Sequence, residues 1–541
     1  MFGISFTDNR WLFSIANAYR GKMMLYFFLE ILNIISTLFF VFFSKNSIDI
    51  ALGVKEGSLQ WNLCYVVGLV LLGIVFRTSS QWVNQKTQIR MLQGVQYKIL
   101  QRQMLSTWRV IKRWDTGDIL VRLNTDCVEI VQMLSSTWIA FVITVIKLLA
   151  SFIFLFTLDK SLAIIILCIT PLFFLSKIYF RKMKKLNEDV KASESELGVV
   201  MQENLRYRTV LRSLGILAKR LRKVIEKQNT FSSLKLAHLR FSLLSQTAMR
   251  TAMSVGYVVA FVWGVYRLQQ GVITYGTMTA FLQLVNQVQS PILTLGAFVP
   301  AFIRFKVAIQ RVKDLNNVEF QRERKGVEFG QIDYVSFEEV SFSYGEERII
   351  DDFNARFELG DKVAITGASG KGKTTLIRLM LGMLKPNQGS VKISGDGTVS
   401  ELAIEHIENF SYVPQGNTLL KGTVRENIVA TNEMVSEERI REVLHYACAE
   451  FVYDLPEGLE TYVGESGLGL SEGQAQRIAI ARAILRDKKI WLFDEATSAL
   501  DAETTDLFLE RINPLLEKKI AIFVTHDKKV TLFCNKHIML N

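Results

Sequence analysis

The hydrophobic and polar positions of this 541-residue chain divide it into two halves with different periods. Up to about residue 305, long apolar segments alternate with polar stretches, and six segments have roughly the twenty residues that a helix needs to cross a bilayer. The six expected spans are Met24–Phe43, Leu63–Trp82, Trp138–Leu158, Leu162–Tyr179, Thr251–Val265 with an upstream extension, and Thr279–Phe302. Farther along, the pattern is that of an α/β domain, with short apolar runs of strand length between helical patterns.

The links between the expected spans alternate in length. The second and fourth links, Asn84–Ser136 and Arg181–Gln246, are long, polar and helical in pattern, and they hold about eight and about fifteen Lys and Arg residues. The short links hold one or two each. Basic residues gather on the cytosolic side of a membrane. We therefore expect the long links, both termini and the α/β domain in the cytosol.

The composition and the net charge agree with a chain that has membrane spans and basic cytosolic links. The chain is 49% hydrophobic and carries a net charge of +12, most of which comes from the long links. Such a charge can indicate nucleic-acid binding, but the basic residues flank membrane spans instead of forming one patch, so we expect no nucleic acid. The cysteines are scattered without the spacing of a metal site or a disulfide framework. They are Cys64, Cys127, Cys168, Cys448 and Cys534.

The N-terminal stretch lacks the pattern of a cleavable signal peptide. We expect Met1–Tyr19 to form a short amphipathic helix on the inner membrane surface, with Trp11, Leu12 and Phe13 at the headgroups. No peptidase-like pattern precedes the spans, so processing of a leader peptide is not expected.

A glycine-rich loop in the last third of the chain has the form of a phosphate-binding loop. Gly367–Thr374 follows the apolar run Val363–Ile365 and opens a helical pattern over Thr375–Leu384. Its glycines allow backbone N–H groups to surround a polyphosphate, next to the positive end of a helix. Lys373 is placed to reach the terminal phosphates. The residues expected to bind nucleotide here are Gly367, Ser369, Gly370, Gly372, Lys373, Thr374 and Thr375.

Further polar residues follow at the ends of apolar strands. Ile490–Phe493 leads into Asp494, expected to hold Mg²⁺ together with the Thr374 hydroxyl, and into Glu495, expected to polarise the attacking water. Ile520–Thr525 leads into His526, a candidate contact of the γ-phosphate. Gln415 offers an amide that can sense both metal and water. The predicted catalytic residues are Glu495, His526, Gln415 and Lys373, and the predicted metal ligands are Thr374, Gln415 and Asp494.

With the small-residue turn Leu470–Gln474, these segments resemble, in this order, the ATP-binding cassette transporters, in particular an exporter-type half-transporter. The resemblance implies an all-α six-span transmembrane domain followed by an α/β P-loop NTPase domain of the ATP-binding cassette type. The implied domains are 1–310 with two cytosolic coupling loops, a linker over 311–331, and the nucleotide-binding domain over 332–541. The chain stops soon after His526, at Asn541, where members of the family usually continue through another short strand or helix.

The resemblance assigns roles residue by residue. Tyr344 matches the aromatic residue that stacks on adenine. Ser471, Gly473 and Gln474 match the signature turn, which completes the nucleotide site of the partner subunit, so that an isolated monomer should hydrolyse ATP poorly. Two further segments match family positions at the dimer interface. They are Ser498–Asp501, which joins the two sites, and Val463–Gly467, which touches the partner's loops.

The chain departs from the family pattern at two positions. Glu472 stands where the signature usually carries glycine, and Lys371 stands where the loop often carries a small residue. Either the two side chains pair across the closed dimer, or both are solvated at tolerant positions. Neither departure removes a catalytic group.

The long links are expected to couple ATP turnover to movement of the spans. By resemblance, Thr116–Asp118 with Arg122 and Asp126 marks the tip of the first link, and Asn204–Leu211 marks the tip of the second. The alternative is that the links are only solvated extensions of the spans. Their length, about fifty to seventy residues, is far above that of ordinary loops and favours the coupling role.

Polar residues inside the spans are candidates for contacts with cargo, because charges are costly in a membrane. They are Glu30, Asn33, Lys147, Arg250, Gln283, Asn286, Gln287 and Gln289, the last four just before Pro291. Spacing on the sixth span favours a cavity lining for its amide residues. The alternative is that Glu30 pairs with Lys147 or Arg250 within the bundle, or that these side chains reach the surface.

We expect an ATPase that exports or flips an amphipathic cargo, whether peptide, lipid or drug, with ATP and Mg²⁺ as cofactors. Its partners would be the lipid bilayer and a second half-transporter, and intact motifs favour a homodimer. The bacterial inner (plasma) membrane is the expected location. The alternative is an ATP-gated channel or a regulatory subunit of a heterodimer, which intact Glu495 and His526 disfavour. A soluble mechanical ATPase is excluded by the spans.

Overall fold

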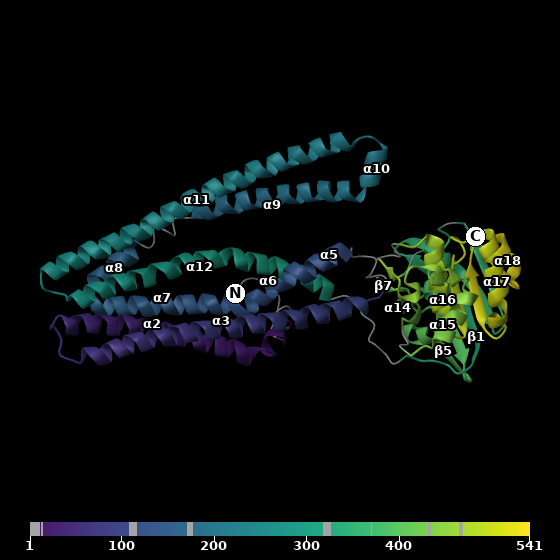
Figure 1. The fold of residues 1–541 in the computed structure, drawn as a ribbon, viewed down its shortest axis with the longest axis horizontal. Coiled ribbons are helices and arrows are strands. Elements are labelled where there is room, and N and C mark those ends of the chain that lie inside the picture. The colour runs from purple at the N-terminus through teal and green to yellow at the C-terminus, as the bar shows by residue number, and fades with distance from the viewer. Residues whose placement is uncertain are drawn as a thin grey trace. The chain divides into compact units, whose positions relative to one another are not determined.

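A computed structural model describes Trp11 and residues 14–107, 116–169, 177–316, 326–368, 370–416, 418–430, 434–464 and 469–540. Its contacts divide the chain into two compact units. The first unit consists of Met1–Arg102 and Asp115–Val318, and the second of Gln103–Trp114 and Glu319–Asn541. Helices make up the first unit, and strands with shorter helices make up the second (Figure 1).

The apolar runs of the first half lie in helices, as the hydrophobic pattern predicts. The helices are α2 (Arg20–Ala51), α3 (Leu59–Met104), α5 (Thr116–Val121), α6 (Cys127–Gln132), α7 (Trp138–Leu158), α8 (Lys160–Ile169), α9 (Lys177–Arg206), α10 (Arg208–Ser213), α11 (Leu217–Gln269) and α12 (Tyr275–Asn316), with π-helical turns η1 (Arg122–Asp126) and η2 (Met133–Thr137). Within the described residues, four helical stretches are long and apolar enough to cross a membrane: Arg20–Ala51, Leu59–Met104, Thr116–Leu158 and Leu217–Gln269.

The remaining two expected spans are less clear-cut. The fourth, Leu162–Tyr179, falls on α8 and α9 and on residues 170–176, which lie outside the described residues. The sixth lies within α12, which contains Pro291 and Pro300. Of the expected N-terminal amphipathic helix, only Trp11 and residues 14–19 are described, and residues 14–17 are helical.

The long links are helical, as expected. In the second link α9 and α11 run side by side and α10 joins them at the far end (Figure 1). In the first link, Arg122 binds Asp118 at 2.8 Å and donates to the Arg311 carbonyl of α12 at 2.6 Å. Arg311 in turn lies 3.3 Å from Asp126. These contacts tie the start of the third membrane helix to the end of α12.

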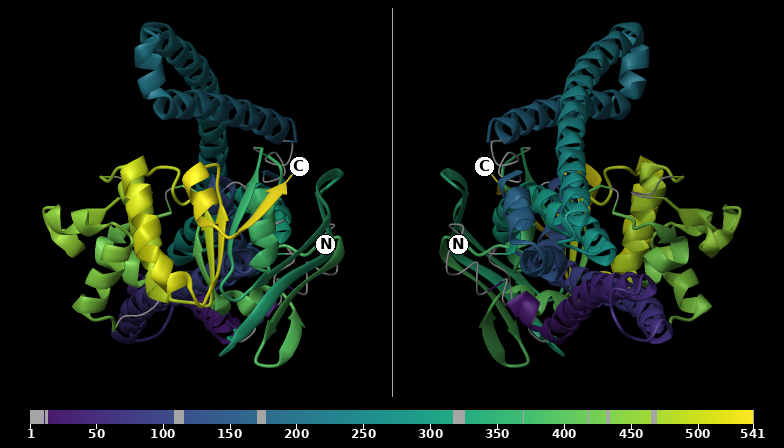
Figure 2. Two further views of the ribbon diagram at one scale, coloured as in Figure 1. Left: turned by 90° about the vertical axis from the view of Figure 1, so that its right-hand side faces the viewer. Right: turned by 90° about the vertical axis from the view of Figure 1, so that its left-hand side faces the viewer.

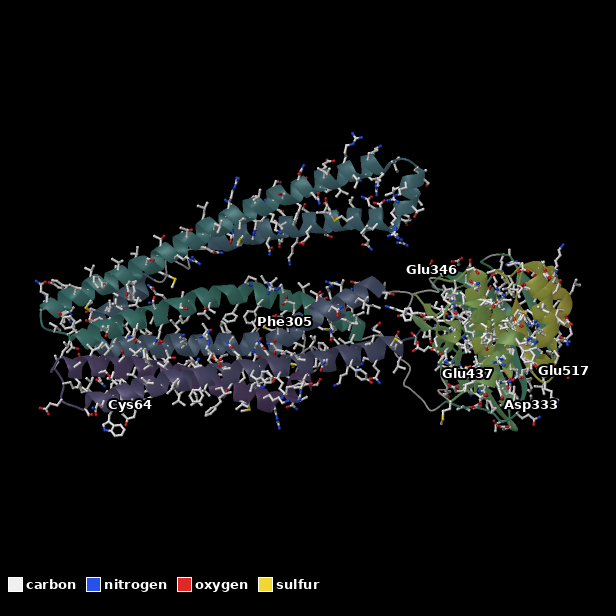
Figure 3. All side chains as sticks on the ribbon, viewed as in Figure 1. Cys64, Phe305, Asp333, Glu346, Glu437 and Glu517 are labelled. Atoms are coloured by element: carbon white, nitrogen blue, oxygen red, sulfur yellow. The ribbon has the colours of Figure 1, made fainter. Side chains whose placement is uncertain are left out.

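Side chains of the first unit separate into inward and outward positions. A core cluster joins five helices: it contains Val41 of α2, Leu155 of α7, Leu162 of α8, Ala260 of α11 and Phe281 of α12. Phe305 of α12 is also buried, whereas Cys64 of α3 is exposed (Figure 3). Exposed apolar residues are numerous on these helices, which suits a surface that faces lipid.

The second unit contains a parallel five-stranded sheet beside an antiparallel four-stranded sheet. The parallel sheet has the order β11 (Lys536–Leu540), β3 (Lys362–Gly367), β10 (Ile520–Val524), β9 (Ile490–Asp494) and β6 (Phe410–Val413). The antiparallel sheet has the order β2 (Glu347–Glu358), β1 (Ile332–Tyr344), β4 (Gln388–Gly395) and β5 (Thr398–Glu401). A short pair joins β7 (Gly422–Thr423) to β8 (Tyr462–Val463).

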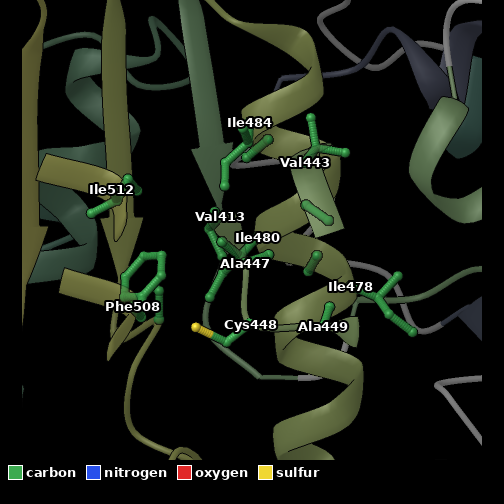
Figure 4. Packing of buried hydrophobic residues seen from close by; sticks show 14 of the residues in the cluster. Val413, Val443, Ala447, Cys448, Ala449, Ile478, Ile480, Ile484, Phe508 and Ile512 are labelled. Carbon is green, nitrogen blue, oxygen red and sulfur yellow. The ribbon is translucent and has the colours of Figure 1, made fainter. Parts of the chain in front are cut away.

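Helices cover both faces of the parallel sheet (Figure 2). They are α13 (Lys373–Met380), α14 (Val424–Val429), α15 (Glu437–Tyr446), α16 (Glu472–Arg486), α17 (Ala502–Leu516) and α18 (Lys528–Phe533), with 3₁₀ turns η4 (Ile404–Asn409), η5 (Glu450–Asp454) and η6 (Gly458–Glu460). Alternation along β9 sends Leu492 to the face under α13, and Trp491 and Phe493 to the other face. There the isoleucines of α16 pack against α15, with Phe508 of α17 in the same cluster (Figure 4).

The chain continues beyond His526 through two further elements. These are α18 and β11, and β11 pairs with β3 in parallel at the edge of the sheet. The Leu540 carbonyl lies 2.5 Å from the place where a Cβ on Gly367 would stand, so β11 closes against the phosphate loop.

Candidate functional site

The glycine-rich loop lies between β3 and α13, as predicted. Gly370 and Gly372 have φ angles of 85° and 89°, a backbone conformation that glycine adopts without strain. A Cβ on Gly372 would also lie 2.8 Å from the Ile349 side chain of β2. The loop therefore needs glycine there. Ser369 lies outside the described residues.

Lys373 begins α13 and points back over the loop. Its ammonium donates hydrogen bonds to the Gly367 carbonyl at 2.8 Å and to the Ala368 carbonyl at 3.0 Å. The residue is 7% exposed. The lysine predicted to reach phosphates thus lies against the loop that would surround them. Thr374 and Thr375 follow in the first turn of the same helix.

Asp494 ends β9 and is the predicted ligand of Mg²⁺. Both of its carboxylate oxygens are buried, and neither has a hydrogen bond of ordinary geometry within the described part of the chain. Burial raises the pKa of Asp494 to about 6, while the nearby Thr374 hydroxyl lowers it and the Glu495 charge raises it. A buried carboxylate that has no hydrogen bond of ordinary geometry fits a cation, so the oxygens of Asp494 and Thr374 suit Mg²⁺.

Glu495 follows Asp494 and lies beside two of the other predicted catalytic residues. The Gln415 amide donates to one carboxylate oxygen of Glu495 at 2.7 Å. The His526 Nε2 atom lies 3.8 Å from the other oxygen. Three strand ends, those of β6, β9 and β10, therefore bring Gln415, Glu495 and His526 together. The arrangement can orient and deprotonate a water molecule.

Gln476 of α16 belongs to the same group, although no sequence pattern singles it out. Its amide nitrogen donates to the Glu495 carbonyl at 2.9 Å, and its amide oxygen accepts from the Ala499 N–H at 3.2 Å. Only 2% of the residue is exposed. It fixes the backbone on both sides of the turn that follows β9. A glutamine in mid-helix carries no local signal for this role.

The predicted signature turn caps α16. The Ser471 hydroxyl accepts from the Gln474 N–H at 3.2 Å, and the Gln474 side chain accepts from the Ser471 N–H at 2.9 Å. A Cβ on Gly473 would lie 2.6 Å from the Ala499 carbonyl, so glycine is needed there. Within the described residues, no hydrogen bond joins the signature turn to the phosphate loop of its own chain.

Tyr344 ends β1, next to the β1–β2 turn. Its ring packs edge-on against Phe342 with centroids 4.9 Å apart, and its hydroxyl lies 3.5 Å from an Arg378 guanidinium nitrogen. Arg378 belongs to α13, the helix that begins at the phosphate loop, so Tyr344 stands beside that helix. Stacking on adenine stays a prediction.

Other predicted interface residues are placed only in part. Asp501 caps α17 by accepting from the Thr504 N–H at 2.8 Å. In the Val463–Gly467 segment, residues 465–467 lie outside the described residues. Lys371 and Glu472 are both exposed, and their pairing across a dimer stays a prediction.

The polar residues of the spans have different surroundings. Glu30 accepts a hydrogen bond from Ser80 of α3, and no ion pair joins it to Lys147 or Arg250 in the described part of the chain. The alternative in which Glu30 pairs with one of these cations is therefore not observed among the described residues. Ser151 of α7 donates to the Gln287 side chain of α12 at 3.4 Å. Arg250 and Asn286 are exposed, Asn33 is half-buried, and Gln289 is buried.

Comparison with known proteins gives the same two parts. Residues 23–292 match the family described as the ABC transporter transmembrane region, and residues 350–498 match the ABC transporter family. Proteins of Staphylococcus aureus strains COL and N315, named multidrug export ATP-binding/permease proteins, are 27% identical over 478 residues, covering 85% of this chain and 82% of theirs.

A solved structure shares the fold. It is described as a bacterial Atm1-family ABC exporter with ATP bound, and it matches with a TM-score of 0.79 at 21% identity. The match covers 97% of this chain and 94% of the other.

Proposed function

Because the chain belongs to the exporter-type ATP-binding cassette transporters, with its membrane region fused to its ATPase domain, we propose that two copies form a dimer that drives an amphipathic cargo out of the cytosol or across the bilayer. The observation that carries the proposal is the convergence of Glu495, Gln415 and His526 on one edge of the parallel sheet. A chain that only bound nucleotide would have no need of this group.

The chemistry is hydrolysis of the terminal phosphate of ATP. Glu495 would accept a proton from the attacking water, and Gln415, bound to it at 2.7 Å, would hold that water in line. His526 would contact the γ-phosphate from the end of β10. Asp494 and Thr374 would hold Mg²⁺, which supplies positive charge beside the phosphates.

Each nucleotide would be completed by the signature turn of the second subunit. Ser471 caps the positive end of α16, and no hydrogen bond joins this end to its own phosphate loop in the described residues. Loop and signature are both intact, which supports a homodimer. ATP would then stabilise the closed dimer relative to the open one, and hydrolysis would reverse that preference.

The class of cargo and the kind of membrane are proposed mainly from the relatives, because the nucleotide site does not depend on either. Those proteins are named multidrug exporters and are bacterial, so we propose a bacterial plasma membrane and an amphipathic small molecule, lipid or peptide as cargo. The basic long links would lie in the cytosol together with the ATPase domain.

The test is the ATPase rate of the purified protein in lipid, with and without added cargo classes. We expect Glu495→Gln to lower the rate about a hundredfold or more while ATP still binds, because the base is lost and the loop is not. Glu510→Gln, an exposed change on α17, should leave the rate unchanged. Equal rates for wild type and Glu495→Gln would reject the proposal.

A further inference from the structure

Lys147 stands near the middle of the third expected span, where a charge is costly. It is the tenth residue of α7, which runs from Trp138 to Leu158. On insertion scales, lysine is among the least favourable residues at the centre of a membrane helix. In a protein this cost is usually offset by a partner or accepted for a function.

The position of Lys147 on its helix turns it toward other protein and away from lipid. Ile143, Lys147, Ser151 and Leu155 are spaced four residues apart and share one face of α7. The other three are buried, with 8%, 0% and 0% exposed. On the opposite face, Leu149 and Ile153 are 54% and 60% exposed. Lys147 itself is half-buried.

The helix that faces Lys147 is α12. Phe141 meets Phe298 at 5.7 Å between centroids, and Ser151 meets Gln287 at 3.4 Å, so the two helices run antiparallel. One turn back from Ser151 on α7 is Lys147, and one turn on from Gln287 on α12 is Pro291. Lys147 therefore lies within about one helical turn of the amide residues on α12.

Lys147 has no carboxylate partner within the described residues. Glu30 is the one acidic residue in the six expected spans, and it is bonded to Ser80. No ion pair within 4.0 Å involves Lys147 among the residues that the structure describes. The ammonium thus brings an uncompensated positive charge to the inner side of the helices.

The nearby amides add neutral donors to that charge. Gln287 accepts from Ser151 through its oxygen, which leaves its NH₂ group as a donor with no bond to another described residue. One turn before Gln287 on α12, on the side away from Lys147, the side-chain oxygen of Gln283 is buried without a partner in the described part of the chain. A cation and amide N–H groups are the usual partners of carboxylate and phosphate oxygens.

We propose that Lys147, with the amide of Gln287, is an anion-binding point on the cargo pathway, so that the transported molecule is an amphipathic anion carrying a carboxylate or a phosphate. This inference rests on the proposed transport function and adds the charge of the cargo. Apolar parts of such a molecule would contact the apolar walls of the same helices. A cationic amphiphile would be repelled at this point.

The test compares probes that share one hydrocarbon tail: an alkyl phosphate, an alkyl carboxylate and an alkyl trimethylammonium. Stimulation of ATPase activity is measured in lipid for wild type, Lys147→Met and Lys147→Arg, and probe binding to nucleotide-free protein is measured by calorimetry. We expect the anions to bind and stimulate wild type, Lys147→Met to raise the half-stimulating concentration about tenfold or more, and Lys147→Arg to restore it. The cation should gain from Lys147→Met. The phosphate and carboxylate arms identify the headgroup.

Lys160→Met is the matched control, because Lys160 is exposed at the start of α8, outside the third span. Anions that act equally on wild type and Lys147→Met, or a cation that stimulates wild type better than the anions, would overturn the inference. If Lys147→Met does not fold, Gln287→Leu provides a second test of the site. An unchanged affinity of Gln287→Leu for the anionic probes would count against the site. A wild type that hydrolyses ATP and responds to none of the anions would reject the inference while the ATPase function stands. Loss of basal turnover in wild type would instead strike the proposed function.

Discussion

Glu495 has a backbone conformation that residues with a side chain rarely adopt. Its φ angle is 51°, in the left-handed region, which costs about 1–2 kcal/mol for such a residue. Two hydrogen bonds hold it there: its N–H donates to the Val524 carbonyl at 2.9 Å, and its carbonyl accepts from Gln476. The strained turn places the carboxylate between Gln415 and His526, so backbone geometry and catalysis are connected at this residue.

Gln476→Leu should therefore slow hydrolysis without weakening nucleotide binding. The change removes the hydrogen bond to Glu495 and that from Ala499 at nearly constant volume, and we expect kcat to fall about tenfold, the equivalent of one net hydrogen bond of about 1.4 kcal/mol. The KM for ATP should change little, because the phosphate loop is untouched. Steady-state ATPase kinetics measure both. Gln388→Leu, an exposed change on β4, is the control. An unchanged kcat in Gln476→Leu would show that Glu495 does not depend on this support.

Asp494 should make the stability of the nucleotide-free protein depend on pH. Its pKa is raised to about 6 in the folded state, from an ordinary value of 3.8. The fold accepts Asp494 in its protonated form. The contribution of this group to the free energy of unfolding is therefore complete below about pH 4 and is lost as the pH rises through about 6. Above that range the ionised form destabilises the fold by up to about 3 kcal/mol.

Asp494→Asn removes this ionisation, and we expect it to stabilise the nucleotide-free protein at pH 7 but not at pH 4. Thermal unfolding of the ATPase domain within the full chain, followed across this range without Mg²⁺, measures the difference. Glu517→Gln, an exposed change, should give no such pH-dependent gain. A gain of the same size at both pH values would show that ionisation of the buried carboxylate is not the cause.

At the scale of elements, the tip of the second long link is a braced structure. Arg220 of α11 donates to Asn204 at 2.8 Å and pairs with Glu203 at 2.6 Å, which ties the end of α9 to the start of α11 around α10. Leu211 on α10 is buried within this tip, whereas Val210 is 49% exposed. The tip thus offers a supported outer surface, as a coupling element requires.

Val210→Asp should reduce transport per ATP hydrolysed while leaving ATP binding intact. The change places a charge on the outer surface of α10 without touching the brace, so we expect transport to fall about tenfold relative to ATPase rate. Paired measurements of uptake into inverted vesicles and ATP turnover test this. Val199→Asp, 61% exposed on α9, is the matched control. Equal coupling ratios for the two variants would favour the view that the link is only a solvated extension.

The sequence predicts an element well where its buried residues form a regular apolar pattern along the chain. The buried strand β9 is built on an apolar run of four residues and β10 on one of five. Asp494 and His526 could be found because they come just after those runs. β11 was missed, since its residues alternate between exposed and half-buried and include Lys536 and His537. The contacts of Gln476 join residues of α16 to the turn after β9, and such pairings depend on the folded chain.

At the scale of the whole molecule, the proposed dimer predicts complementation between two inactive variants. Lys373→Ala damages the phosphate loop and Ser471→Ala the signature, so a mixed dimer of the two would contain one intact composite site. We expect coexpression to yield ATPase activity well above that of either variant alone. Lys373→Ala mixed with Glu495→Gln is the control, because both residues belong to the same half of a site and no intact site can form. Equal activity in the two mixtures would argue against sharing between subunits.

Lys373 turns back toward its own loop, where carbonyl groups accept hydrogen bonds from its ammonium. These hydrogen bonds to two carbonyls of the loop partly satisfy the positive charge. An arriving nucleotide must displace these bonds, and a departing one lets them form again. This exchange lowers the affinity of the loop for the nucleotide and favours release of the nucleotide. Because a transporter must release ADP in every cycle, a lysine that can bind its own loop again would favour that release.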